Sequence, residues 1–246
     1  MARIDAITLH NYCTSFLIYN REEFEIVTEF KKIFAAAARE IGIALSAREV
    51  SQFDTYRREI LIWNEKISLV SAKSIVDLPI KHCIDSLTAV KLIAPECVTL
   101  LDIGAGAGFP GIPLKIVRSS LKLTLVDSHR KKVTFLKNVA LKLKLTDIVI
   151  LNRRIESFIN NERHLGMYDV VISRATFGLS QYISLGAPFL SPQGVLIAMK
   201  GRGVDAELEV ALDIANREKL ILAERHELDL PVIGDKRILL AFKRSD

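Results

Sequence analysis

A glycine-rich turn behind a short apolar run holds the residues best suited to chemistry. The run is Leu100-Leu101-Asp102-Ile103, and glycines follow at positions 104, 106, 108 and 111. Glycine has no Cβ and adopts positive φ readily, so such a turn lets the backbone approach a ligand closely. Because a strand that breaks into a glycine turn is typical of parallel sheets that bind nucleoside cofactors, the segment predicts a cofactor site.

The surroundings of the glycines indicate which cofactor this is. The GxGxxG pattern of dinucleotide folds is formally present, but the apolar strand already ends at Gly104. Pro110 and Pro113 also remove N–H donors from the segment that would bind a pyrophosphate. The arrangement of Asp102, Gly104 and Gly106 resembles motif I of class I S-adenosylmethionine-dependent methyltransferases. The resemblance implies S-adenosylmethionine as cofactor, with these three residues in its site.

A second carboxylate, Asp127, follows the apolar stretch 121–126, about twenty residues beyond the turn. A carboxylate at this position can accept both hydroxyls of a ribose, which fits a dinucleotide as well as S-adenosylmethionine. The alternative is that Asp127 caps the following helix, whose apolar positions are Val133, Leu136, Ala140 and Leu143. We favour the ribose role because the glycine turn precedes it.

The composition narrows the class of protein. The chain has 246 residues, half of them apolar, and three widely spaced cysteines at positions 13, 83 and 97. No CxxC pair or zinc-ligand spacing is present, so we expect reduced, buried thiols and no metal site. No apolar run is long enough for a membrane span, and the first residues do not resemble a signal peptide. We therefore expect a cytoplasmic protein without a membrane partner.

The formal net charge of +5 is distributed unevenly. Basic clusters recur along the chain, and several follow predicted strands, where ligands bind in open α/β folds. This pattern suggests a polyanionic partner such as a nucleic acid, while the alternative for any one cluster is a solvated surface. The clusters are Arg57-Arg58, His129-Arg130-Lys131-Lys132, Arg153-Arg154, Lys200 with Arg202, Lys236-Arg237 and Lys243-Arg244.

Periodicity divides the chain near residue 95. Residues 1–95 read as a helical appendage packed on the core, with helices predicted at 22–41, 46–65 and 76–93, and no assignment for the first twenty residues. In residues 96–246 strands alternate with helices, which predicts a Rossmann-like parallel sheet, and this part of the chain resembles the class I S-adenosylmethionine-dependent methyltransferase domain. Its strands are predicted at 98–103, 121–126, 147–151, 169–173 and 194–199, and a hairpin at 220–228 and 237–242 ends the sheet. The prediction is an α/β fold with a mostly parallel, seven-stranded sheet.

Five segments of the chain together carry a more specific resemblance. They are Trp63-Asn64-Glu65-Lys66-Ile67-Ser68-Leu69, Lys81-His82-Cys83-Ile84-Asp85-Ser86-Leu87, Gly108-Phe109-Pro110-Gly111-Ile112-Pro113-Leu114, Ser173-Arg174-Ala175 and Lys200-Gly201. With these segments the chain resembles the glucose-inhibited division protein B family, whose members are guanine-N7 methyltransferases of 16S ribosomal RNA. The resemblance implies transfer of a methyl group from S-adenosylmethionine to a guanine N7 in the small ribosomal subunit, near the decoding site. The chain departs from the family pattern at Lys81, where arginine is usual, and at Ile155, where alanine or valine is common.

The same resemblance assigns site residues. It implies cofactor contacts at Gly104, Phe109, Ile155, Glu156 and Arg174, with the adenine ring beside Ile155. Substrate contacts are expected at Arg174, Lys200 and His82. The alternatives are a surface salt bridge for Arg174, an ordinary lysine at a strand end for Lys200, and a hydrogen bond in a helix cap or the core for His82.

The absence of two sequence motifs bears on which nucleophile is methylated. The chain contains no Pro-Cys pair for attack on a pyrimidine and no Asn/Asp-Pro-Pro-aromatic segment for exocyclic amines. Guanine N7 has a free lone pair and needs no general base, so we expect catalysis by positioning and assign no catalytic residue. Two other functions stay open: a methyltransferase of the same fold for a small molecule or protein, and an inactive nucleotide-binding or ribosome-assembly module.

Overall fold

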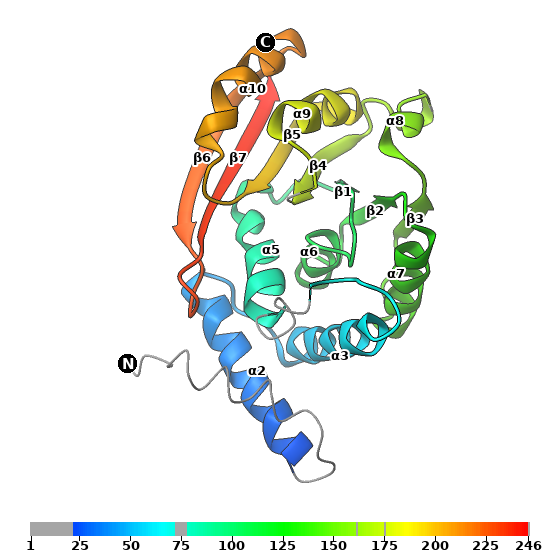
Figure 1. Ribbon diagram of the computed structural model, residues 1–246, viewed down its shortest axis with the longest axis vertical. Helices are drawn as coiled ribbons and strands as arrows, with labels where there is room; N and C mark the ends of the chain where they lie inside the picture. The colour runs from blue at the N-terminus through cyan, green and yellow to red at the C-terminus, as the bar shows by residue number, and fades with distance from the viewer. Residues whose placement is uncertain (1–21, 72–77, 161, 175, 246) are drawn as a thin grey trace.

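The computed structural model describes residues 22–71, 78–160, 162–174 and 176–245 (Figure 1). Two helices come first, α2 (Glu22–Glu40) and α3 (Ala47–Asn64), followed by a helical stretch made of η1 (Leu78–Ile84), α5 (Asp85–Leu87) and η2 (Thr88–Leu92). From there strands and helices alternate, as the sequence predicts. They are β1 (Thr99–Ile103), α6 (Gly111–Val117), β2 (Lys122–Asp127), α7 (Arg130–Lys142), β3 (Ile148–Asn152), α8 (Ile155–Phe158), η3 (Glu162–His164), β4 (Tyr168–Arg174), α9 (Leu179–Gly186), η4 (Ala187–Phe189), β5 (Leu190–Lys200), α10 (Asp205–Arg217), β6 (Leu220–Asp229) and β7 (Lys236–Arg244).

The strands form one seven-stranded sheet in the order β3-β2-β1-β4-β5-β7-β6. The pairs among β1 to β5 are parallel, whereas β7 is antiparallel to both β5 and β6. The predicted hairpin is therefore confirmed, and it forms the long ribbon at one side of Figure 1. The order reverses beside β1, so the carboxyl ends of β1, β2 and β4 meet at the point where ligands bind in open α/β sheets.

Alternating side chains bury both faces of the sheet. Leu100 and Leu125 belong to the core on one face, and Leu101 and Val126 belong to the core on the other. Residues of α2, α3, α6 and α7 complete the first core, while α8, α9 and α10 complete the second. The helices before β1 thus share one continuous apolar core with the sheet.

The start of α3 is set locally. Ser46 Oγ accepts the Glu49 N–H at 3.3 Å, and Glu49 Oε2 accepts the Ser46 N–H at 2.6 Å. This capping box satisfies two backbone donors at the helix terminus, as the sequence predicts.

The third helical segment is less regular than the sequence predicts. Its predicted start at residue 76 lies outside the described residues, and from Leu78 it passes through a π turn, a short α segment and a 3-10 turn. Side chains supply donors to its backbone: the carbonyls of Lys81, His82 and Asp85 accept hydrogen bonds from Arg174, Ser86 and Thr88. Such side-chain bonds compete with the regular helical pattern, and π turns are frequent at functional sites. Among the described helices, none is long and apolar enough to cross a membrane.

Candidate active site

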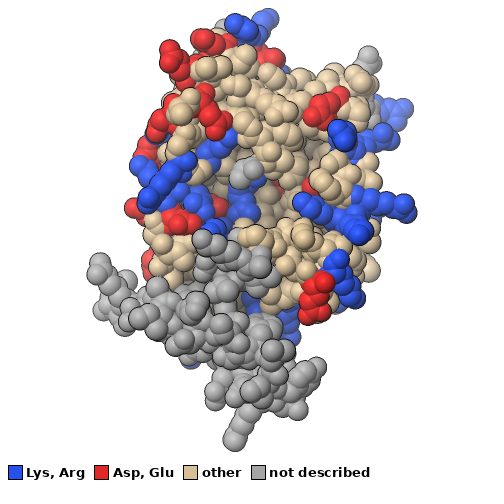
Figure 2. Space-filling view, in the orientation of Figure 1, with Lys and Arg blue, Asp and Glu red and all other residues tan. Residues whose placement is uncertain are grey.

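A cavity of about 510 Å³ opens at the carboxyl ends of β1, β2, β3 and β4. In the orientation of Figure 1, the space-filling view is hollowed near its middle, with Lys and Arg side chains on both sides of the hollow (Figure 2). The cavity wall consists of Leu69, Val70, His82, Gly104, Ala105, Gly106, Ala107, Phe109, Val126, Asp127, Ser128, His129, Lys132, Arg153, Arg154, Ile155, Glu156, Arg174, Thr176 and Phe177. Eight of the ten residues that the sequence assigned to the site are on this wall.

The glycine turn needs glycine at two of these positions. Gly104 has a φ of +73°, and a Cβ there would lie 2.5 Å from the Thr176 side chain. Gly106 has a φ of +58°, and in the described part of the chain, its two sequence neighbours aside, a Cβ there would have only the Gly104 carbonyl oxygen within 4 Å, at 3.9 Å. L-residues with side chains rarely adopt such φ values, so both positions favour glycine. The turn therefore presents bare backbone to the cavity.

Asp127 ends β2 and connects the glycine turn to the start of α7. Its Oδ2 accepts the Gly106 N–H at 2.8 Å, and its Oδ1 accepts the His129 N–H at 2.7 Å. Asp127 does not cap α7, because His129 is the N-cap residue and the helix has no side-chain cap, so Asp127 only holds the backbone just before it. It also lines the cavity, as the ribose role requires. A carboxylate offers about four acceptor positions, so further hydroxyl donors can still bind.

The segment that follows β3 contributes both charged and apolar side chains to the cavity. Ile155 is buried, whereas Arg153, Arg154 and Glu156 are exposed at the cavity edge. Together with Lys132 from α7, the two arginines give this edge a positive charge. In the sequence these basic residues belong to two separate clusters, and only the fold brings them to one cavity.

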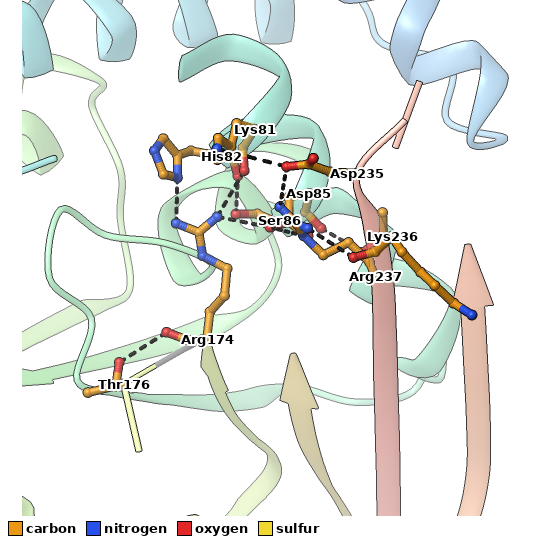
Figure 3. Close-up of polar contacts among 10 residues, drawn as sticks. Lys81, His82, Asp85, Ser86, Arg174, Thr176, Asp235, Lys236 and Arg237 are labelled. Atoms are coloured by element: carbon orange, nitrogen blue, oxygen red, sulfur yellow. Dashed lines mark hydrogen bonds and ion pairs between the residues drawn. The ribbon is translucent and has the colours of Figure 1, made fainter. Parts of the chain in front are cut away.

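On the other side of β1, Arg174 extends from the end of β4 to the irregular helical stretch (Figure 3). Its Nη2 donates to His82 Nδ1 at 2.7 Å, and its Nη1 lies 3.1 Å from Asp85 Oδ2. The ring of Phe109 lies 5.0 Å from the His82 ring and 5.0 Å from Arg174 Cζ. Cation–π and stacking contacts therefore hold the three side chains together.

Asp85 joins Arg174 to the C-terminal hairpin. The same Oδ2 atom also lies 3.0 Å from Arg237 Nε, and Arg237 Nη2 lies 3.5 Å from Asp235 (Figure 3). One buried carboxylate thus faces two guanidinium groups, one from β4 and one from β7. In the sequence, Asp85 belongs only to the family-like segment 81–87 and Arg237 only to a basic cluster, because nothing local links either residue to Arg174.

The Arg174 contact fixes the protonation of His82. A guanidinium has only donors, so His82 Nδ1 must be the acceptor and the ring proton must be on Nε2. Burial, together with the nearby Arg174, Lys81 and Arg237 charges, lowers the pKa of His82 to about 3. The imidazole is therefore neutral at physiological pH.

Two predicted site residues lie off the cavity wall. Asp102 is fully buried, and its Oδ2 accepts the Gly111 N–H at 2.8 Å, so it braces the far end of the turn. Burial raises the pKa of Asp102 to about 7. Lys200 Nζ donates to the Phe177 carbonyl at 2.8 Å and lies 3.3 Å from Glu207. Their contacts to ligand stay predictions.

The cysteines and acidic residues give no sign of a metal centre in the part of the chain that the structure describes. There, no group of three or more His, Cys, Asp or Glu side chains is arranged to hold a metal ion. Cys83 is buried and Cys97 half-buried, both as free thiols, and Cys13 lies outside the described residues.

Solved structures share this architecture. Ribosomal protein L11 methylase from Lactobacillus delbrueckii subsp. bulgaricus matches with a TM-score of 0.52 at 14% identity, covering 68% of this chain and 79% of its own. M. jannaschii TYW2 in complex with AdoMet matches with a TM-score of 0.51 at 17% identity, covering 73% and 80%. At such low identity the likeness concerns the fold alone. The sheet order and the cavity beside the glycine turn define a class I S-adenosylmethionine-dependent methyltransferase.

The family follows from closer relatives. The model of the family rRNA small subunit methyltransferase G (GidB) matches residues 49–235. A ribosomal RNA small subunit methyltransferase G from Syntrophus aciditrophicus is 44% identical over 215 residues, covering 87% of this chain and 89% of the relative. The chain belongs to the GidB family and is an S-adenosylmethionine-dependent methyltransferase of small-subunit ribosomal RNA. The resemblance found in the sequence is confirmed.

The cavity fits this cofactor in size and chemistry. A volume of about 510 Å³ lies in the usual range for small-molecule sites. Gly106 leaves the space of a Cβ open beside the Asp127 carboxylate, and Ile155 supplies an apolar contact. The wall therefore combines bare backbone, an acceptor for hydroxyls and an apolar side chain, as an adenosine moiety requires.

Proposed function

We propose that the protein methylates N7 of a guanine in 16S ribosomal RNA, near the decoding site of the small ribosomal subunit. The supporting observation is that His82 and Arg174, the polar pair beside Phe109, cannot remove a proton. Arg174 is permanently charged, and the one lone pair of His82 that could act as a base is already bonded to it. A target base beside this pair suits the reaction if its nucleophile carries a free lone pair, as guanine N7 does.

The cofactor residues are also a proposal. Asp127 would accept the ribose hydroxyls, and Ile155 and Glu156 would hold the adenine. Gly104 and Gly106 would leave room for the chain of the cofactor to pass close to the backbone of the turn. When bound, S-adenosylmethionine supplies an electrophilic methyl group on its sulfonium. The residues of the chain then contribute by orienting the base and excluding water.

The positive edge of the cavity supports an RNA substrate. Lys132, Arg153 and Arg154 are on the cavity wall, and phosphate contacts of this kind position a nucleic acid without reading its sequence. A base that enters the cavity must be unpaired, which is the usual form in which proteins read RNA specifically. Because ribosomal subunits are assembled in the cytoplasm, we place the enzyme there.

The test is transfer of labelled methyl groups from S-adenosylmethionine to unmodified small subunits, with naked 16S RNA, total RNA and a protein extract assayed alongside. Nucleoside analysis should find the label in N7-methylguanosine, and mapping should place that nucleotide near the decoding site. Label in another nucleoside would refute the N7 assignment, and label in protein would refute the RNA substrate. Label in N7-methylguanosine at a distant position would refute only the location.

A further inference from the structure

His82 carries a hydrogen-bond donor that the fold leaves unused. Its Nε2 atom is buried and has no hydrogen-bond partner in the structure, although the side chain is on the cavity wall. Buried polar groups in native proteins are nearly always paired, and one that is not calls for an explanation. An acceptor on a ligand in the cavity would provide that partner.

The donor is held in a fixed orientation. The Arg174 guanidinium donates a hydrogen bond to His82 Nδ1, so the ring proton is confined to Nε2. The Phe109 ring lies against the imidazole with an interplanar angle of 23°. Asp85 in turn holds Arg174, and Arg237 holds Asp85. Residues of the glycine turn, β4, α5 and β7 thus hold one neutral N–H in place, and a buried donor held in this way loses free energy unless it finds an acceptor.

The chemistry of the proposed substrate indicates which acceptor this is. The edge of guanine that carries N7 presents two acceptors, N7 and O6, whereas adenine replaces O6 with an amino donor. N7 must keep its lone pair free for the methyl group, which leaves O6 for recognition. A neutral donor also suits the reaction, because methylation at N7 makes the purine cationic and a charged donor would repel it.

We propose that His82 is the specificity-determining residue that selects guanine by donating its Nε2–H to O6 of the target base. This assignment rests on the proposed N7 methylation. In this role His82 recognises the base, in contrast to the hydrogen bond in a helix cap or the core that the sequence left as the alternative. A site built to bond an acceptor rejects a base that lacks it, because the buried donor is then left unpaired.

The experiment compares bases and variants together. Small subunits are reconstituted with guanosine, inosine or 2-aminopurine at the mapped target position. Inosine keeps both O6 and N7, whereas 2-aminopurine keeps N7 and lacks O6. The values of kcat/KM for methyl transfer are measured with the wild type, His82→Phe and His82→Gln, and calorimetry gives the Kd for S-adenosylmethionine. His164→Phe serves as the matched control, because His164 is half-buried against Phe158 and lies off the cavity.

We expect the wild type and His164→Phe to prefer guanosine and inosine over 2-aminopurine by roughly tenfold to a hundredfold. In His82→Phe this preference should fall to within a few-fold, with the Kd for cofactor little changed. His82→Gln, which keeps an amide donor, should recover part of the preference. Comparing ratios between enzymes cancels the different intrinsic reactivity of the two bases.

Three results would overturn the proposal while leaving N7 methylation intact. They are a wild type that methylates 2-aminopurine as well as guanosine, a His82→Phe variant that keeps the full preference, and a His82→Phe variant whose only defect is weaker cofactor binding. The last would assign the donor to the cofactor. If the wild type forms no N7-methylguanosine, the proposed function itself fails. Because the first result needs only the wild type, misfolding of a variant would not block the test.

Discussion

The Tyr56 hydroxyl donates a hydrogen bond of 2.5 Å to the carbonyl of Ala107, inside the glycine-rich turn. Tyr56 lies on α3, 51 positions earlier in the chain, and its fully buried ring lies 5.3 Å from the ring of Phe109. A Cβ on Gly108 would come within 2.8 Å of the Tyr56 oxygen, so the two chain segments fit together closely. A helix outside the strand-and-helix alternation therefore braces the wall of the candidate cofactor site.

Removing this hydroxyl should affect both stability and cofactor binding. We expect Tyr56→Phe to lower the free energy of unfolding by about 1–2 kcal/mol, because a buried carbonyl loses its donor. It should also raise the Kd for S-adenosylmethionine several-fold, since the turn is held less firmly. Tyr182→Phe is the matched control, because Tyr182 is equally buried, bonds the carbonyls of Val171 and Ile197 and lies off the cavity. Equal cofactor affinities in the two variants would contradict the bracing role.

The ribose role of Asp127 predicts a large loss of cofactor affinity. Asp127→Ala removes a charged acceptor and also releases the N–H groups of Gly106 and His129. Hydrogen bonds to charged groups contribute about 1.5–3 kcal/mol each, so the Kd for S-adenosylmethionine should rise more than tenfold. Calorimetric titration measures this, with Asp213→Ala on the exposed side of α10 as control. An unchanged Kd would refute the assignment.

Replacing Arg174 with lysine should lower the rate of methyl transfer, although the positive charge is kept. Its guanidinium contacts His82, Asp85 and the Lys81 carbonyl at once, and an ammonium group cannot match this planar arrangement. We expect Arg174→Lys and Arg174→Ala both to lower kcat for methyl transfer at least tenfold, on the scale of removing one charge-assisted hydrogen bond. Full activity of either variant would make Arg174 a bystander of the reaction.

The buried Asp102 predicts a pH-dependent stability. Burial raises its pKa to about 7, whereas an aspartate in the unfolded chain titrates near 3.9. The folded state therefore binds the proton more tightly, so the associated stability is complete below about pH 4 and is lost as the pH rises through 7. Between pH 5 and pH 8 the free energy of unfolding should fall by roughly 1–3 kcal/mol more in the wild type than in Asp102→Asn. Parallel curves in urea titrations of the two proteins would show that Asp102 is not responsible.

The basic edge of the cavity should determine the salt dependence of RNA binding. Replacing Lys132, Arg153 and Arg154 with alanine should weaken binding to the substrate RNA and make the dependence of log K on log salt shallower, by about one for each RNA phosphate that these side chains neutralise. The Kd for cofactor should change little. Arg217→Ala, at the exposed end of α10, shows what the loss of one positive charge away from the cavity does and is compared with each of the three single alanine variants. A slope that stays the same in the triple variant would exclude these residues from the RNA interface.

Much of the fold was predictable because it depends on local patterns. The apolar periodicity of 121–126 and 133–143 predicts β2 and α7 through burial of alternate or every third and fourth side chains. The spacing of Ser46 and Glu49 predicts the start of α3, since both groups satisfy backbone donors within one turn. The irregular turns at 78–92 were not predictable, because Arg174 supplies one of the side-chain donors to that backbone from 93 positions away.

The sequence by itself therefore determined the parallel sheet, the closing hairpin, the glycine turn and the family. Each depends on neighbouring residues whose spacing is fixed by the chain. Only the tertiary structure decided that Tyr56 braces the turn, that Asp102 and Lys200 lie off the cavity wall, and that His82, Asp85 and Arg237 converge on Arg174. The physical reason is that these contacts depend on how helices and strands far apart in the chain pack together, and a charge or ring in the sequence does not reveal its distant partner.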